Sequence, residues 1–131
     1  MAKRKRKLPR PTDAELAILR VLWQRGPCTV RQVRDELNAD RPTGYTTVLK
    51  LMQIMTEKGL VTRDESRRTH VYQPRLPAEG TQRQLVADLL ERAFEGSAEK
   101  LVMQALSTTK VSSAELAKIR AMLDEIEGAD S

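Results

Sequence analysis

The sequence predicts a mostly α-helical fold with one small β-hairpin, divided between a basic front module and an acidic rear module. Apolar residues recur every three to four positions along most of the chain, which is the period of amphipathic helices. Two short runs rich in β-branched residues interrupt this pattern near the middle. Residues 1–75 carry 17 Lys and Arg against 8 Asp and Glu, whereas residues 76–131 carry 6 against 10. This asymmetry favours two modules, of which the front one binds a polyanion.

Residues 1–11 are strongly basic and include two prolines, so we expect a disordered arm that adds contacts to phosphate or to the minor groove of DNA. An equally good alternative is that this arm has no role in DNA binding and only keeps the protein soluble. The arm lacks the apolar segment of a signal peptide, and no apolar run in the chain is long enough to cross a membrane. We therefore expect a cytoplasmic protein without membrane insertion.

The front module, residues 12–75, begins with two helices whose first turns carry capping patterns. A Thr-x-x-Glu pattern at residues 12–15 predicts the start of the first helix, and a Gly-Pro pair at 26–27 predicts its end. A Thr-x-x-Gln pattern at 29–32 then opens a short second helix that ends near Leu37.

A third helix is predicted within residues 43–59, with Gly44 as its N-cap and Gly59 as its stop. One side of this helix is apolar, and the other carries short hydroxyls, a lysine and an amide. A short helix, a turn and a longer helix form the order of a helix-turn-helix, whose second helix reads the major groove. The alternative is an ordinary solvated helix face. The residues expected to contact DNA from this helix are Tyr45, Thr46, Thr47 and Lys50.

After the third helix the pattern changes to that of strands. Residues 60–63 and 69–72 are β-rich, and the turn between them carries Arg67 and Arg68. A helix-turn-helix followed by a basic hairpin predicts a winged helix whose two arginines contact backbone phosphate. A solvated polar turn is the alternative for each arginine. His70 is expected to face solvent or pack in the wing, because no second metal ligand lies at suitable spacing.

Residues 76–80 have the composition of a linker, and residues 81–127 follow with three amphipathic helical patterns. About fifty residues of amphipathic helix make a poor solitary domain, and two copies packed together would cover their apolar stripes. We therefore expect a homodimerisation module, with packing onto the front module as the alternative. The residues expected at the dimer contact are Leu89, Leu101, Leu106, Leu116, Ile119 and Leu123.

The pattern of reactive residues argues against an enzyme, a cofactor or a metal site. A single cysteine, Cys28, excludes an internal disulfide and a thiolate cluster. The sequence has no glycine-rich phosphate loop and no cluster of His and carboxylates. Four aromatic residues are too few for a platform that stacks single-stranded nucleic acid. The expected partner is therefore double-stranded DNA, and the alternative function is a DNA-independent winged-helix adaptor that binds protein.

Several short motifs occur in an order that resembles one known family. They are the run from Leu16 to Trp23 followed by Gly26, the Thr29-Val30 helix start with Val33 and Leu37, the Tyr45-Thr46-Thr47-Val48 helix start, Lys58-Gly59-Leu60, and Tyr72-Gln73-Pro74. Together they resemble the penicillinase-repressor family of bacterial transcription regulators, over nearly the whole chain after the basic arm. The resemblance implies a winged-helix repressor that binds a palindromic operator as a homodimer and blocks transcription.

The resemblance also implies a regulatory protease as a partner, since family members that respond to β-lactams are cut at an Asn-Phe bond. Aligned through the run Leu101-Val102-Met103, that bond corresponds to Gln104-Ala105 here, so the Asn-Phe pair is absent. Copper-responsive members carry paired cysteines near the C-terminus. This chain has no cysteine there, which excludes a Cu(I)-thiolate switch.

Overall fold

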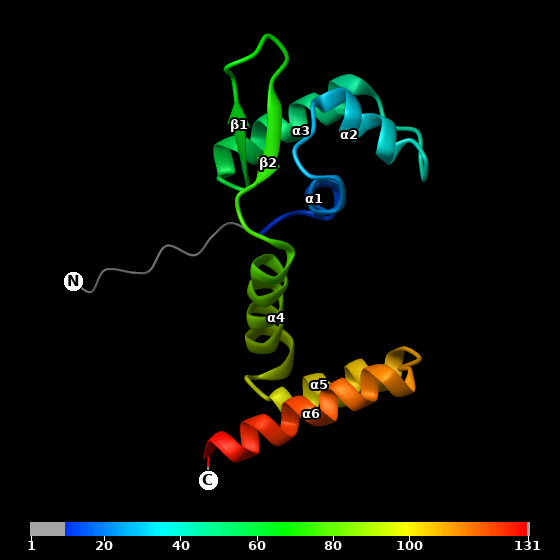
Figure 1. The fold of residues 1–131 in the computed structure, drawn as a ribbon, viewed down its shortest axis with the longest axis vertical. Coiled ribbons are helices and arrows are strands. Elements are labelled where there is room, and N and C mark those ends of the chain that lie inside the picture. The colour runs from blue at the N-terminus through cyan, green and yellow to red at the C-terminus, as the bar shows by residue number, and fades with distance from the viewer. Residues whose placement is uncertain (1–9, 131) are drawn as a thin grey trace, which may run out of the picture. The chain divides into compact units, whose positions relative to one another are not determined.

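The computed structural model describes residues 10–130, so nearly all of the expected basic arm lies outside the described residues. The chain forms two compact units, one up to Val86 and one from Ala87 onward. The elements in order are α1 (Asp13–Arg25), α2 (Val30–Leu37), α3 (Tyr45–Lys58), β1 (Val61–Asp64), β2 (Val71–Pro74), α4 (Ala78–Phe94), α5 (Ala98–Thr108) and α6 (Ser113–Asp130) (Figure 1). No helix within this described stretch is long and apolar enough to span a bilayer.

Capping interactions set the ends of the first three helices. The Thr12 hydroxyl accepts the backbone N–H of Glu15 at 3.2 Å, and the Glu15 carboxylate accepts the backbone N–H of Thr12 at 2.9 Å. A second reciprocal pair of this kind, between Thr29 and Gln32, opens α2. Helix α3 ends at Gly59, whose φ of 80° lies in the left-handed region that glycine adopts without strain. These boundaries confirm the predicted helix starts and stops.

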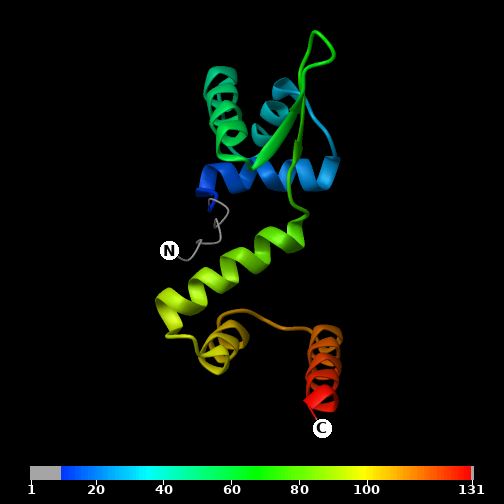
Figure 2. The same cartoon turned by 90° about the vertical axis from the view of Figure 1, so that its left-hand side faces the viewer.

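The first unit is built around one apolar core. Helices α1, α2 and α3 pack against one another, while β1 contacts α3 and β2 contacts α1. Figures 1 and 2 show the hairpin beside this group of helices, with its loop projecting beyond them. The buried apolar residues are Ile18, Leu19, Val21, Leu22, Cys28, Val30, Val33, Val48, Met52, Met55, Val61 and Tyr72. Each of these helices therefore contributes one buried face, as expected from the period of its apolar residues.

The hairpin differs from its predicted position. Its strands pair antiparallel with Val61 opposite Pro74, so β1 starts one residue later and β2 two residues later than predicted. The reason is a contact that local sequence does not show. Tyr72 and Cys28 exchange two backbone hydrogen bonds, at 3.0 and 2.8 Å. These bonds form an isolated antiparallel bridge on the edge of β2 that does not pair with β1. This pairing and the burial of the Tyr72 side chain place Tyr72 inside β2, and not at its end.

An ion pair joins the start of α1 to the end of α3. The Lys58 Nζ atom, in the last turn of α3, lies 2.6 Å from Oε1 of Glu15, in the first turn of α1. Glu15 is 2% exposed. Burial by itself would raise the pKa of this carboxyl, but hydrogen bonds from Lys58 and from the Thr12 backbone outweigh that effect and lower the pKa below its ordinary value. The sequence predicted only the capping role of Glu15.

Helix α4 starts earlier than predicted. It begins at Ala78, so the last three residues of the expected linker, 78–80, are helical. Pro77 precedes the first turn, a place where its missing N–H costs nothing, and its carbonyl accepts the N–H groups of the third and fourth residues after it. The indole N–H of Trp23 donates to the Leu76 carbonyl at 2.9 Å, which holds this start of α4 against α1.

The second unit has no such core. Among residues 87–129, no side chain reaches the buried class. Helix α5 is capped by Ser97, and Ser112 forms a capping pair with Glu115 before α6. Figure 2 shows an extended connection between α5 and α6. The large apolar side chains of this unit that are between 44% and 63% exposed are Leu89, Val102, Met103, Met122, Leu123 and Ile126.

Replacement of Glu15 by Gln should lower the free energy of unfolding by about 1–3 kcal/mol at neutral pH, because a buried charged hydrogen bond to Lys58 is lost. Since the pKa of Glu15 is lowered by folding, its contribution is complete above its unfolded pKa and is lost as pH falls through the lower folded value. Urea denaturation across this pH range measures both effects.

The matched control is Asp13→Asn, which makes the same chemical change in the same helical turn at an exposed position. It should cost less than about 1 kcal/mol, the size of a helix-dipole effect. Equal losses for the two variants would contradict the assigned role of the ion pair.

Candidate nucleic-acid interface

The face of α3 that points away from the core is polar and exposed to solvent. Val48, Met52 and Met55 are fully buried, which fixes the rotation of the helix about its axis. Tyr45, at the first position of the helix, remains 45% exposed. The exposed polar residues that follow it are Thr46, Thr47, Lys50, Gln53 and Glu57. All four residues of α3 that the sequence predicted as DNA contacts therefore reach solvent.

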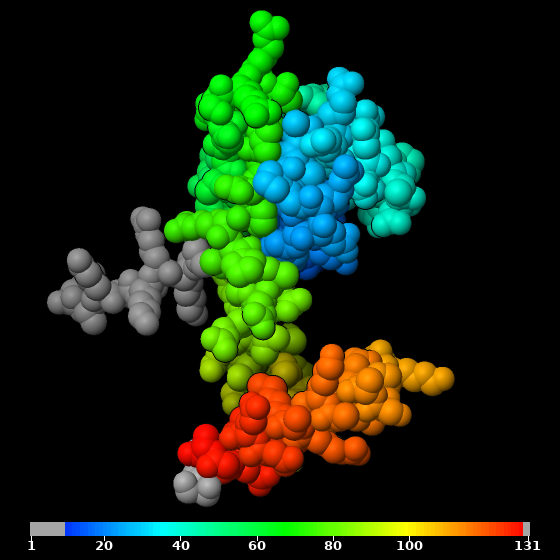
Figure 3. All heavy atoms as spheres, in the orientation of Figure 1, coloured from blue at the N-terminus to red at the C-terminus, as the bar shows by residue number. Residues whose placement is uncertain are grey.

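The loop between β1 and β2 forms the wing. Arg67 and Arg68 are both exposed in this loop, which projects from the first unit (Figure 3). Two carboxylates, at the end of β1 and the start of this loop, both have partners nearby. Glu65 accepts from Arg63 at 2.8 Å, and Asp64 accepts the backbone N–H of Ser66 at 2.9 Å. Hydrogen bonds from the Ser66 hydroxyl and backbone hold the pKa of Asp64 below its ordinary value.

A hollow of about 320 Å³ lies where the wing meets the helices. Its walls come from the start of α2, the first turns of α3, the wing and β2. The polar side chains that line it belong to Thr29, Arg31, Tyr45, Arg68, Thr69 and His70. The structure thus brings together Tyr45 and Arg68, two predicted contact residues that are far apart in the sequence. Lys50 and Arg67 do not line this hollow.

Two residues of the hollow, Arg31 and His70, were not among the predicted contacts. Arg31 could have been found from the sequence, because it lies in the first turn of a capped helix, where cationic side chains and free N–H groups favour anions. His70 was expected to face solvent or pack in the wing. It is half-buried at the edge of the hollow, which only the hairpin register reveals.

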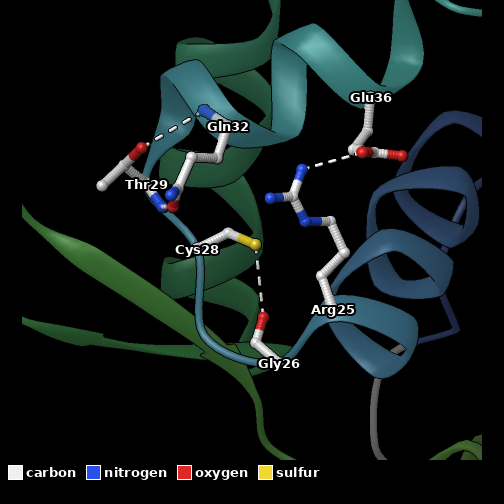
Figure 4. A network of polar contacts seen from close by, with 6 residues as sticks. All are labelled: Arg25, Gly26, Cys28, Thr29, Gln32 and Glu36. Carbon is white, nitrogen blue, oxygen red and sulfur yellow. Dashed lines mark hydrogen bonds and ion pairs between the residues drawn. The ribbon is translucent and has the colours of Figure 1, made fainter.

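The turn between α1 and α2 fixes the position of Arg31. Arg25 donates to the Glu36 carboxylate at 2.7 Å, which ties the end of α1 to the last turn of α2 (Figure 4). In the same turn the Cys28 thiol lies 3.3 Å from the Gly26 carbonyl and points into the protein. The Arg25–Glu36 contact at its last turn, and the backbone bonds of Cys28 to Tyr72 just before its start, therefore hold α2 in place.

Among the described residues, the basic side chains of this surface form no ion pair, although Asp64 interacts electrostatically with Arg67. Within residues 10–130, no ion pair involves Arg31, Lys50, Arg67 or Arg68. Their charges are therefore available to a polyanion, whereas the wing carboxylates are occupied by neighbouring side chains and backbone. In the same described residues, no three His, Cys, Asp or Glu side chains gather where they could hold a metal ion.

The residues predicted at a dimer contact all lie in the second unit. Leu89 and Leu123 are exposed, at 44% and 54%. The other four are half-buried: Leu101, Leu106, Leu116 and Ile119. The Gln104–Ala105 bond lies inside α5, and both of its side chains are exposed.

Three packed helices followed directly by an antiparallel hairpin define a winged-helix domain. The chain belongs to the penicillinase repressor family, which it matches over residues 11–125. It is 44% identical over 69 residues to the transcriptional regulator BlaI of Mycobacterium tuberculosis, covering 52% of this chain and 50% of that protein. The chain thus spans about half the length of this relative. It is 22% identical over 120 residues to the penicillinase repressor of Bacillus licheniformis, covering 92% and 94%.

The fold also matches a solved structure. The solution structure of the DNA-binding domain of the repressor BlaI superposes with a TM-score of 0.50 at 24% identity. The match covers 56% of this chain and 90% of that domain. This likeness confirms the predicted winged-helix fold, and the family match confirms the predicted family.

The thiol of Cys28 should be protected in the folded protein. Burial raises its pKa above the ordinary value, so less of the reactive thiolate is present at a given pH. We expect iodoacetamide to alkylate native Cys28 at least about tenfold more slowly than the unfolded chain near neutral pH. Mass spectrometry of quenched samples, with and without urea, measures the two rates. Similar rates in both samples would show that the turn before α2 opens freely.

Proposed function

We propose that the protein is a sequence-specific repressor of transcription that binds a palindromic operator in double-stranded DNA as a homodimer. One observation carries the proposal: a polar, exposed helix face and a basic wing lie on the same winged-helix domain. Membership of the penicillinase repressor family supports it, as do relatives that are named as a transcriptional regulator and a penicillinase repressor.

Helix α3 would enter the major groove. Thr46, Thr47 and Lys50 have the hydroxyl and ammonium groups that reach base edges or nearby phosphates, and they extend from the exposed side of the helix. Tyr45 would anchor the start of the helix. Arg67 and Arg68 would contact backbone phosphate from the wing, because both side chains are exposed and, among the described residues, neither forms an ion pair, whereas Arg63 pairs with Glu65.

Two copies would associate through the second unit. Its apolar side chains are exposed in a single chain, and covering them provides the hydrophobic gain that this unit lacks by itself. A two-fold symmetric dimer presents two α3 helices to two half-sites, which requires a palindromic operator. Because the proposed partner is double-stranded DNA, we propose that the protein acts in the cytoplasm, where that DNA lies.

A regulatory protease remains part of the proposal as the partner that would end repression. Cleavage at Gln104–Ala105 would require α5 to unwind locally, because a protease needs an extended substrate and this bond lies within the helix. The residues at this bond differ from the Asn-Phe pair of β-lactam-responsive members, so we infer a different trigger or a different point of release.

Selection from a library of random duplexes tests the proposed function. Repeated capture by the full chain should enrich one sequence with two-fold symmetry, and the enriched duplex should bind the protein dimer. If no sequence is enriched above background, the repressor proposal fails and the protein-binding adaptor becomes the better explanation of the fold.

Lys50→Ala and Arg67→Ala should have different effects on this selected duplex. Lys50→Ala should reduce the preference for selected over scrambled DNA, by about 1–3 kcal/mol if the lysine contacts a base. Arg67→Ala should weaken both duplexes alike and lower the slope of log affinity against log salt by about one per protomer. Fluorescence anisotropy over a salt series measures both quantities. Unchanged slopes and preferences in both variants would refute these roles.

Leu123→Glu should convert the dimer to a monomer at micromolar concentration. A buried carboxylate at an apolar contact raises the dimer dissociation constant by about a hundredfold or more. Ala121→Glu is the matched control, because it places the same carboxylate at an exposed position of the same helix, outside the predicted contact. Sedimentation equilibrium distinguishes the outcomes. A monomeric wild-type protein, or a Leu123→Glu variant that stays dimeric, would exclude this contact.

A further inference from the structure

Gln53 lies on the side of α3 that faces away from the core. At about 100° per residue, the buried Val48, Met52 and Met55 fix the inward side of the helix. The residues nearest to the opposite direction, which we call the outward line, are Thr46, Lys50, Gln53 and Glu57. All four are exposed, and they fall within an arc of about 60°. Gln53 is therefore nearer to the centre of the outward side than Thr47 is.

The spacing along the outward line suits contacts to neighbouring base pairs. Thr46, Lys50 and Gln53 are separated by four and then three residues, so each step is about one helical turn, or about 5 Å. Zinc-finger helices contact three successive bases of the major groove with side chains that are likewise about one turn apart. If Lys50 reaches one base pair, Gln53 is therefore placed to reach the next.

The side-chain amide of Gln53 carries a donor and an acceptor next to each other. Among residues 10–130, this amide has no hydrogen-bond partner. In the major groove, adenine presents its N6 amino donor beside the N7 acceptor, and a glutamine amide can pair with both. Guanine presents two acceptors, O6 and N7, which suit a side chain that only donates. The chemistry of Gln53 therefore favours adenine over the other bases.

We propose that Gln53 is a specificity-determining residue that pairs with adenine, at the base pair next to the one that Lys50 contacts in each half-site. This inference rests on the proposed function and assigns a base to one position of the operator. Glu57, the last residue of the outward line, offers only acceptors and repels phosphate. Base contacts along this line therefore end at Gln53.

The first experiment repeats the library selection with the wild-type protein and with Gln53→Ala and Lys50→Ala. The wild-type site should contain one adenine per half-site whose replacement weakens wild-type binding about tenfold or more. Gln53→Ala should lose this preference and keep the preferences at the other positions. Lys50→Ala should instead lose the preference at the adjacent base pair. Fluorescence anisotropy with duplexes substituted at single positions measures each preference.

The matched control is Gln24→Ala, which removes the same amide from an exposed position of α1, outside the predicted contacts. It should select the wild-type sequence at every position. Thermal unfolding by circular dichroism checks that each variant is folded.

The second experiment replaces Gln53 by arginine. A guanidinium donates to both O6 and N7 of guanine but offers no acceptor to the amino group of adenine. Gln53→Arg should therefore prefer guanine at the position where the wild-type protein prefers adenine. A damaged fold would not create a new preference of this kind, so the result separates base contact from a structural role.

Four results would overturn the inference: a Gln53→Ala variant that keeps every preference, a lost preference for a base other than adenine, a lost position that is not adjacent to the one set by Lys50, or a Gln53→Arg variant that still selects adenine. Each of them leaves the proposed function intact if the wild-type protein enriches a symmetric site. Failure of the wild-type selection, in contrast, counts against the proposed function itself.

Discussion

The ion pair between Glu15 and Lys58 is the constraint that fixes α3 on the domain. It joins the first turn of α1 to the last turn of α3, so it sets the end of α3 that lies farthest from Tyr45. Because Glu15 also accepts the Thr12 N–H, the same carboxylate caps one helix and holds another. A buried carboxylate without such partners would destabilise the domain, whereas here it limits how α3 can rotate or slide. Together with the buried Val48, Met52 and Met55, the ion pair keeps Thr46 and Lys50 on the exposed side of α3.

The two units obtain their stability in different ways. The first has a closed apolar core that includes side chains from all three helices and both strands. The second presents apolar side chains to solvent along α4, α5 and α6, and among residues 87–129 none is buried. Since burial of apolar area is the main favourable term in folding, the proposed association of two copies would stabilise the second unit far more than the first.

The sequence predicted those features that local chemistry determines. The capping boxes at Thr12 and Thr29 and the glycine stop at Gly59 placed three helices correctly, because each depends on residues within one turn. The strand register and the position of His70 at the hollow could not be predicted, since both depend on the pairing of Tyr72 with Cys28 across 44 residues of chain. Within the candidate interface, the spacing of apolar residues predicted the exposed face of α3. The sequence did not predict the hollow, because three segments that are far apart in the chain form it.

The same pairing has a consequence for solubility. Strand β2 lies between β1 and the Cys28 segment, so β1 is left as the outer strand of the hairpin. An outer strand offers unpaired backbone groups to other chains and can nucleate aggregates. Here that strand is four residues long and ends in Arg63 and Asp64. Its shortness and its charges oppose edge-to-edge stacking, which matters for a protein whose other unit exposes large apolar side chains.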